Sequence, residues 1–217
     1  MKIDLMAKPE AYYSGDRQEM LGYIPRTAKK ILEIGCGEGN FGAHLKKELM
    51  AEVWGVEYDA SQAAAAAKQL DRVFSGDVAG IVGEFPPHYF DVIVCNDVLE
   101  HLTDPYSVLE KLKSNLTATG VLVSSLPNIR YFRTFFDFVL HKNWDYTDNG
   151  IMDKTHYRFF TIKSIRKMYE NLGYEVLTHE GINATKSIRP FLWNLLFLGF
   201  FSDIKYRQFA TVVRPKI

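Results

Sequence analysis

A glycine-rich run is the first place where this sequence could hold a ligand. Residues 31–42 read ILEIGCGEGNFG, so a short apolar segment leads into the alternating glycines Gly35, Gly37 and Gly39. Glycine lets the chain turn sharply and approach a ligand without a Cβ clash. The helix expected after the run presents unpaired N–H groups to a polar or anionic group. The run predicts a ligand-binding loop; a merely tight strand-to-helix turn is the alternative.

The same run also satisfies the dinucleotide-binding fingerprint. Gly37, Gly39 and Gly42 have the G-x-G-x-x-G spacing, and Glu57 follows at about the right distance. An NAD(P)-dependent oxidoreductase is therefore an alternative. Glu33 argues against it, because a carboxylate near a buried strand end needs a cationic partner and would repel a pyrophosphate.

Acidic and amide side chains recur where the predicted strands end. Glu57 closes the second strand, Asp77 follows the third, and Asn96 and Asp97 follow the fourth. In an open parallel sheet these positions line the crevice beyond the carboxyl ends of the strands. Hydrogen-bond acceptors gathered there suit a ligand with ribose hydroxyls, an amino group and a positive charge.

Alternating strand-like and helix-like segments position these residues and predict an α/β protein with a largely parallel sheet. With no internal repeat, one domain is expected over residues 1–217. It would comprise a helical lead-in (1–28), an aromatic cap segment (128–160) and an apolar insertion (187–205). Strands are expected at 30–34, 52–57, 72–75, 89–95, 120–126, 174–178 and 209–213, and helices at 41–50, 61–70, 106–116 and 162–172.

The composition argues against several other classes. The 26 basic residues match 26 acidic ones, which argues against a nucleic-acid binder. Two cysteines cannot form a disulfide framework, and residues 1–10 lack the apolar core of a secretory signal, so a cytoplasmic location is expected. The apolar run at 191–201 is shorter than the roughly 20 residues that span a bilayer. Residues 189–201 are expected to form an acceptor-pocket wall, a dimer contact or a weak membrane-surface contact.

Residues 29–128 resemble the class I S-adenosylmethionine-dependent methyltransferases. The resemblance is carried, in the family's order and spacing, by ILEIGCGEG, GVEYD, SGDV, FDVIVCNDVLEHLTDP and GVLVSSLPN. It implies a Rossmann-like, seven-stranded, mostly parallel sheet flanked by helices. It also implies a methyltransferase (EC 2.1.1 class) with S-adenosylmethionine as cofactor and S-adenosylhomocysteine as product.

The resemblance further implies roles around the crevice. Glu33 flanks the methionine amino group, and Asn96 lines the sulfonium side. Glu57 accepts both ribose hydroxyls, Tyr58 packs on the adenine, and Asp77 accepts from the adenine amino group. Taken alone, Glu57 could be a solvated strand-end acid and Asp77 a turn residue. The implied cofactor-binding residues are Glu33, Gly35, Cys36, Gly37, Gly39, Glu57, Tyr58, Asp77, Val78, Asn96 and Asp97.

Two histidines compete for the role of general base. Methyl transfer mainly needs alignment, but a hydroxyl acceptor must also lose its proton, which histidine can take near neutral pH. His101 lies in VLEHLT; instead of acting as a base, it could support the cofactor pocket structurally. His156 lies in DKTHYRFFT, which resembles a stretch of bacterial methyltransferases associated with glycan and lipid-linked sugar biosynthesis. There Asp153 would orient His156, and Arg158 with Tyr157 would bind the acceptor. The alternative is a helix-start hydrogen bond with Arg158 paired to Asp153.

The sequence thus predicts methylation of a hydroxyl on a small-molecule, sugar or lipid-linked acceptor. Tyr12, Tyr13 and Arg17 are expected to fold over the cofactor, with Arg17 meeting the methionine carboxylate, or simply to pack. No metal site is assigned, and a monomer or homodimer is expected. The NAD(P)-dependent oxidoreductase and a non-catalytic S-adenosylmethionine-binding module remain alternatives.

Overall fold

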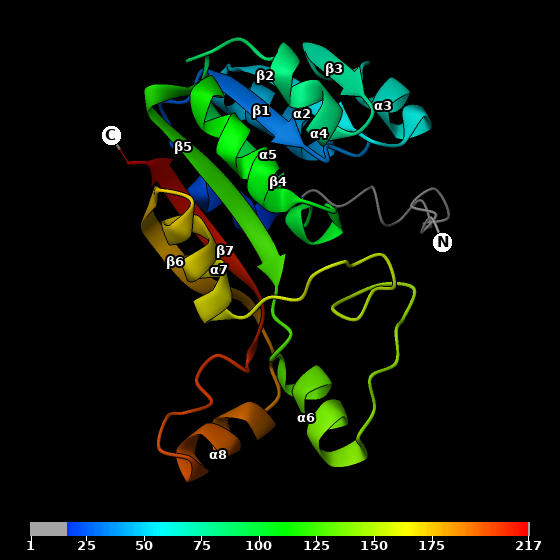
Figure 1. Ribbon diagram of the computed structural model, residues 1–217, viewed down its shortest axis with the longest axis vertical. Coiled ribbons are helices and arrows are strands. Elements are labelled where there is room, and N and C mark those ends of the chain that lie inside the picture. The colour runs from blue at the N-terminus through cyan, green and yellow to red at the C-terminus, as the bar shows by residue number, and fades with distance from the viewer. Residues whose placement is uncertain (1–16, 217) are drawn as a thin grey trace.

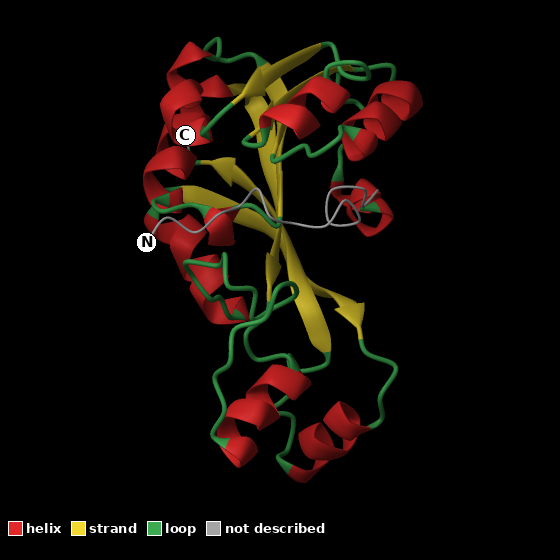
Figure 2. Ribbon diagram, turned by 90° about the vertical axis from the view of Figure 1, so that its right-hand side faces the viewer, coloured by secondary structure: helices red, strands yellow, loops and turns green. Residues whose placement is uncertain are grey.

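The computed structural model describes residues 17–216, which form a seven-stranded sheet with helices on both faces (Figures 1 and 2). The strand order is β3-β2-β1-β4-β5-β7-β6. All neighbours from β3 to β5 pair in parallel, and β7 pairs antiparallel with both β5 and β6. This is the Rossmann-like sheet predicted above. The strands are β1 (Lys30–Ile34), β2 (Glu52–Glu57), β3 (Arg72–Ser75), β4 (Phe90–Asn96), β5 (Leu116–Pro127), β6 (Tyr174–Ala184) and β7 (Tyr206–Pro215).

Two apolar clusters hold the helices against the sheet. One packs α4, α5 and α7 against one face, and the other packs η2, α2 and α3 against the opposite face. The central strand β4 is apolar along its length because both of its faces are covered. The helices are η2 (Gln18–Tyr23), α2 (Asn40–Leu49), α3 (Ala60–Ala66), α4 (Val78–Ile81), η3 (Val82–Glu84), η4 (Leu99–His101), α5 (Pro105–Leu112), η5 (Lys113–Asn115) and α7 (Ile162–Asn171).

Two helical predictions need correction, and a third is only partly described. The alanine-rich helix α3 ends at Ala66 and not at residue 70, because the chain turns there and buries Leu70 against the glycine positions of the neighbouring loop. Helix α5 ends at Leu112 and continues only as the 3-10 turn η5. Of the expected helical lead-in, residues 18–23 form the 3-10 helix η2, and residues 1–16 lie outside the described part of the chain.

The last strands are longer than predicted. β6 continues to Ala184 and β7 begins at Tyr206, and these two residues pair with each other. Polar side chains interrupt the apolar pattern of both strands. Their backbone groups nevertheless satisfy one another across the antiparallel ladder, so the strands continue beyond the buried stretch.

Two further helices lie beyond the end of the sheet (Figures 1 and 2). Helix α6 (Phe132–His141) follows β5, and helix α8 (Arg189–Leu196) lies between β6 and β7. We call residues 131–146 and 187–205 the distal lobe. Its small apolar core contains Tyr131, Phe132 and Ile204. Arg130 ties the lobe to the sheet through an ion pair with Asp203, with Nε and Oδ2 2.7 Å apart.

Much of the distal lobe's apolar surface is exposed. In the described part of the chain, however, no helix combines the length and apolar character needed to cross a membrane. The expected apolar insertion is therefore a short surface helix and its following turns. Its exposed apolar side chains include Ile188, Phe191, Leu192, Leu195, Leu196, Phe197, Leu198 and Phe200.

Candidate active site

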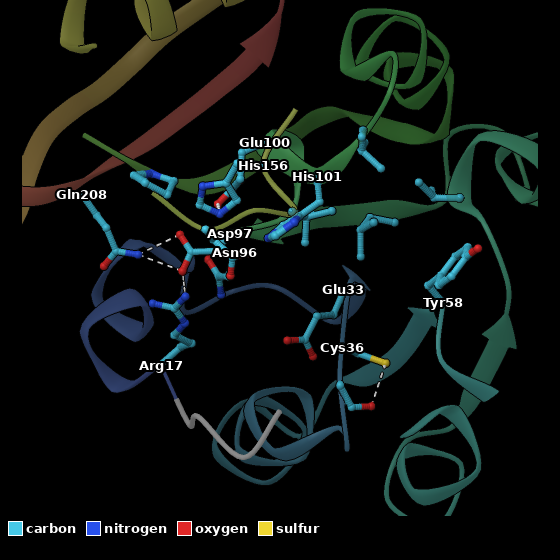
Figure 3. Close-up of a pocket in the computed structure, with 18 of the residues that line it drawn as sticks. Arg17, Glu33, Cys36, Tyr58, Asn96, Asp97, Glu100, His101, His156 and Gln208 are labelled. Atoms are coloured by element: carbon cyan, nitrogen blue, oxygen red, sulfur yellow. Dashed lines mark hydrogen bonds and ion pairs between the residues drawn. The ribbon is translucent and has the colours of Figure 1, made fainter. Parts of the chain in front are cut away.

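A cavity of about 1340 Å³ opens at the carboxyl ends of β1, β2 and β4 (Figure 3). Its wall combines the glycine loop, these strand ends, the start of α4 and part of the cap segment. Gly39 and Arg158 are not among its lining residues, and Tyr12 and Tyr13 lie outside the described residues. The predicted residues that line it are Arg17, Glu33, Gly35, Cys36, Gly37, Glu57, Tyr58, Asp77, Val78, Asn96, Asp97, His101, Asp153, His156 and Tyr157.

The glycine loop is held close against the strand ends. Gly35 has φ of +70°, and a Cβ there would lie 2.5 Å from Cγ2 of Val98. The Gly37 N–H donates to Oε2 of Glu57 over 2.8 Å. Gly39 instead begins α2, where a Cβ would press on Ala66. The first two glycines therefore shape the cavity, and the third serves helix packing.

Glu33 places a buried carboxylate beneath the loop. The residue is only 4% exposed, and its Oε2 accepts no hydrogen bond within the described structure. Burial raises the pKa of Glu33 to about 8; a backbone hydrogen bond from Gly42 opposes the rise, and the nearby charge of Glu57 adds to it. A buried acid without a full set of partners is costly, so this position fits a cationic group of a bound ligand.

Glu57 and its neighbours supply acceptors at the next strand end. Besides the bond from Gly37, Oε1 of Glu57 accepts from the Asp59 N–H over 2.9 Å. Each carboxylate oxygen can accept a second hydrogen bond, as ribose hydroxyls require. Tyr58 is exposed at the rim, and Asp77 caps α4 by accepting from the Ala79 N–H.

The end of β4 adds a free amide and a bound carboxylate. Neither side-chain polar atom of Asn96 has a hydrogen-bond partner in the described structure. Asp97 adopts a left-handed backbone (φ 51°) and accepts from Gln208 Nε2 at 2.7 and 2.8 Å. It also accepts from Ser125 and forms an ion pair with Arg17. Arg17 thus lines the cavity while paired with Asp97; its expected contact with a methionine carboxylate stays a prediction.

A second group of side chains lies on the same wall. His156 Nε2 is 4.0 Å from Oε1 of Glu100, and the two imidazole rings of His101 and His156 lie 4.6 Å apart (Figure 3). Burial raises the pKa of the Glu100 carboxyl to about 8. Glu100 was not among the residues predicted from the sequence; its position beside His101 on η4 was the available signal. Gln208 was not predicted either, because it lies 111 residues from Asp97 along the chain and carries no local signal.

Hydrogen bonds inside the cap segment hold the predicted side chains. The His156 Nδ1 atom contacts the Ile151 carbonyl over 3.0 Å. The orienting role expected for Asp153 stays a prediction. Asp153 Oδ1 accepts from the Thr155 N–H and hydroxyl over 2.8 and 2.7 Å. Arg158 donates to the Leu102 carbonyl over 2.7 Å, which ties the cap to the loop after η4. Its expected contact with the acceptor stays a prediction.

The strand order and the acid-lined cavity at the carboxyl ends of the parallel strands define the molecule as a Rossmann-like methyltransferase fold. A family model described as "Methyltransferase domain" matches residues 8–179, and the chain belongs to this family. Its cofactor is S-adenosylmethionine, which sets the dinucleotide alternative aside. The Oε2 atom of Glu33 and the amide of Asn96, which have no hydrogen-bond partner among the described residues, fit the amino group and sulfonium of that cofactor. The glycine cradle fits its close approach to the backbone.

Curated relatives match a little under half of the chain. A probable S-adenosylmethionine-dependent methyltransferase of Mycobacterium tuberculosis is 34% identical over 104 residues, covering 47% of this chain and 37% of that protein. A ubiquinone biosynthesis O-methyltransferase of Pseudomonas entomophila is 38% identical over 97 residues, covering 40% of this chain and 39% of that protein. The matches thus span well under half the length of these relatives.

Solved structures resemble the whole fold. A methyltransferase from Archaeoglobus fulgidus superimposes with a TM-score of 0.67 at 20% identity, covering 90% of each chain. The [4+2]-cyclase SpnF superimposes with a TM-score of 0.60 at 12% identity, covering 87% of this chain and 76% of that one. The same fold therefore occurs in a protein named for another reaction, and the fold alone does not define the chemistry.

Proposed function

We propose that this protein transfers a methyl group from S-adenosylmethionine to a hydroxyl oxygen of an acceptor with an apolar portion. One observation carries the proposal: Glu100, His101 and His156 line the same cavity as the cofactor acceptors Glu33 and Glu57. A group that promotes loss of a proton is useful when the acceptor is a hydroxyl.

The half of the cavity that Glu33, Glu57 and Asn96 line binds the cofactor and aligns its methyl group. When bound, S-adenosylmethionine supplies an already activated methyl group. We assign the amino group of the cofactor to Glu33, the ribose hydroxyls to Glu57 and the sulfonium side to Asn96. Asp77 accepts from the adenine amino group, with Tyr58 and the buried Val78 beside the ring. Fixing the methyl group relative to its acceptor is where most of the rate enhancement arises.

The other half of the cavity, near His156, binds the acceptor and takes up its hydroxyl proton. A carbonyl oxygen can only accept, so the contact with Ile151 places the His156 proton on Nδ1 and the basic lone pair on Nε2. In the absence of a metal ion, His156 Nε2 is the atom that we assign to the hydroxyl proton. Tyr157 lies at the cavity edge as a side chain for acceptor binding.

The distal lobe supports an acceptor with an apolar portion. Residues 189–201 expose many apolar side chains, and Tyr131 of the same lobe lines the cavity. Several relatives are named ubiquinone biosynthesis O-methyltransferases. We therefore favour a lipid-linked sugar or phenol as acceptor and a weak contact of residues 189–201 with a membrane surface.

A labelled-methyl assay tests the proposal. Protein and S-adenosylmethionine are incubated with a polyprenyl-phosphate-linked sugar, a long-chain alkylphenol and a catechol, and label in product and release of S-adenosylhomocysteine are measured. His156→Ala should abolish turnover while S-adenosylhomocysteine still binds in calorimetry. Unchanged turnover in His156→Ala would remove its proposed role. Cofactor binding without turnover on any hydroxyl acceptor would favour the non-catalytic module.

A further inference from the structure

Three potential metal ligands converge on the inner wall of the cavity. Glu100 and His101 come from the short helix η4, and His156 comes from the cap segment, 55 residues after His101. One ligand atom from each lies within 4.8 Å of the others, as Figure 3 shows for the three side chains. Glu100 and His156 are buried, and His101 is half-buried.

Hydrogen bonds fix both imidazoles in the form that a metal ion needs. His156 Nδ1 contacts the Ile151 carbonyl at 3.0 Å, and His101 Nδ1 contacts the Thr155 carbonyl at 3.2 Å. A carbonyl only accepts, so each ring carries a proton on Nδ1, and the neutral form of each ring has its lone pair on Nε2. Metal-ligating histidines typically hold their second nitrogen in this way.

The Asp153 carboxylate also supports His101, through the hydroxyl of Thr155. The Thr155 hydroxyl donates to Asp153 Oδ1 over 2.7 Å and lies 3.1 Å from His101 Nδ1. The hydroxyl can therefore accept from the ring while its own proton points to Asp153. This assigns Asp153 a positioning role toward His101, through Thr155.

The carboxylate of Glu100 is buried without a hydrogen-bond partner in the described part of the chain, although the charge of Arg17 acts to lower its pKa. It is 1% exposed, and neither carboxylate oxygen accepts a hydrogen bond within the described residues. The His156 Nε2 atom, 4.0 Å from Oε1, is too distant for a hydrogen bond. A buried carboxylate facing basic imidazole nitrogens is stabilised when a cation lies between them.

We propose that Glu100, His101 and His156 bind one divalent cation, with Zn²⁺ as the preferred ion. Two nitrogen donors and one carboxylate suit Zn²⁺ or Mn²⁺ better than Mg²⁺, which prefers oxygen ligands. Ligands of a tetrahedral ion with bonds of about 2.1 Å lie about 3.4 Å apart, so the cluster contracts by roughly an ångström on binding. Three protein ligands leave a coordination position open.

The open position gives the cation a use in the reaction; this part rests on the proposed function. A hydroxyl oxygen held there becomes more acidic, and its proton passes to water. The oxygen's electron pair then forms the new C–O bond while the methyl–sulfur bond breaks and leaves its pair on sulfur. With the cation bound, His156 is a ligand and not the base predicted from the sequence.

The first test measures binding without cofactor or acceptor. Tag-free, chelator-treated protein is titrated with Co²⁺, followed by its visible absorption, and with Zn²⁺ in calorimetry. One equivalent should bind to wild type. Glu100→Gln and His156→Gln should weaken binding more than about 100-fold, and Thr155→Val about 10-fold, the range for loss of outer-shell support. Retained S-adenosylhomocysteine binding and an unchanged melting curve show that each variant is folded.

The matched control is His88→Gln. His88 Nδ1 also contacts a backbone carbonyl, that of Leu116 at 3.3 Å, but the residue lies outside the cavity. This variant should bind the ion like wild type. Absence of a Co²⁺ band in folded wild type, or equal Zn²⁺ affinity in Glu100→Gln, would overturn the site.

Activity separates the two proposals. Methyl transfer that persists at full rate in metal-free protein would overturn the metal's role and leave the proposed function standing. One equivalent of bound ion, lost in Glu100→Gln, with no methyl transfer to any hydroxyl acceptor would support the site and overturn the proposed function.

Discussion

The carboxylate of Glu33 occupies the space that a side chain at Gly42 would need. A Cβ at Gly42 would lie 2.8 Å from Glu33 Oε2, and equally close to Leu70 Cδ2. The third glycine of the apparent dinucleotide fingerprint therefore makes room for a buried acid. The pattern that suggested a pyrophosphate loop belongs, in this fold, to a site for a cationic ligand.

Replacing Gly42 by alanine should destabilise the protein. Overpacking costs about 1–3 kcal/mol, whereas alanine contributes roughly 1 kcal/mol in a helix. Urea unfolding should therefore show a net loss of up to about 2 kcal/mol, together with weaker S-adenosylhomocysteine binding. Gly80→Ala is the matched control, because a Cβ there meets nothing within 4 Å. Equal stability of Gly42→Ala and Gly80→Ala would contradict the steric account.

Cofactor affinity should rise with pH through the ionisation of Glu33. Because the pKa is raised to about 8, the unliganded protein holds a neutral acid at pH 6. A cationic amino group binds the ionised form more tightly, so affinity for S-adenosylmethionine should increase from pH 6 toward pH 8. Glu33→Gln should bind more weakly and lose much of this dependence. Calorimetry at several pH values measures the affinity of wild type and Glu33→Gln for S-adenosylmethionine. Parallel pH profiles of the two proteins would rule out Glu33 as the titrating group.

The same acid should make the unliganded protein less stable as pH rises. The Glu33 pKa is higher in the folded chain than its ordinary value of 4.5, so the folded state binds more protons. This contribution is fully present below about pH 4.5 and is lost as pH rises through about 8. Glu33→Gln should flatten the fall in unfolding free energy between pH 5 and pH 8, leaving the part due to Glu100, whose pKa is also raised. An identical fall in the variant would argue against this assignment.

Glu57→Ala should abolish cofactor binding in calorimetry. The substitution removes the ribose acceptor and the partner of the Gly37 N–H at once. Charge-assisted hydrogen bonds contribute about 1.5–3 kcal/mol each, so a loss of at least about 100-fold is expected. Glu84→Ala, at an exposed site outside the cavity, should bind S-adenosylhomocysteine normally. NADH should bind none of these proteins, and tight NADH binding would reopen the dinucleotide interpretation.

Charges in the distal lobe should release the protein from membranes. The double variant Leu195→Glu and Leu198→Glu removes two exposed apolar side chains. Co-sedimentation with vesicles of phosphatidylcholine and phosphatidylglycerol should fall to background, because the apolar contact is lost and anionic lipids repel the new charges. Leu177→Glu, exposed on β6, is the control and should sediment like wild type. Equal sedimentation of all three proteins would exclude lipid contact through this lobe.

The predicted cofactor residues share a local sequence signal that Glu100 and Gln208 lack. Glu33, Glu57 and Asn96 sit at strand ends within one local pattern, so strand assignments alone bring them to one edge of the sheet. Glu100 can be recognised as a site residue only once its contact with His156 is known. Gln208 can be recognised only once β7 is known to lie antiparallel beside β5. Such contacts depend on tertiary packing, so no residue spacing in the sequence indicates them.

Element ends were mispredicted for a related reason. The alanines of α3 favour a longer helix, but burial of Leu70 beside the glycine loop ends it at Ala66. β6 and β7 continue through polar residues because the backbone N–H and C=O groups of each strand form hydrogen bonds with those of the other. Long-range burial and ladder pairing outweighed local propensity in both cases.

Glu100 joins the cap to the cavity through both of its ends. Its backbone carbonyl accepts from the N–H groups of Tyr157 and Arg158 at 2.9 and 3.4 Å, while its carboxylate faces His156. One residue therefore contacts the cap backbone and is also one of the three proposed cation ligands. For the cation and acceptor proposed above, reciprocity would require that an acceptor which stabilises this cap position tighten cation binding by the same factor by which the cation tightens acceptor binding.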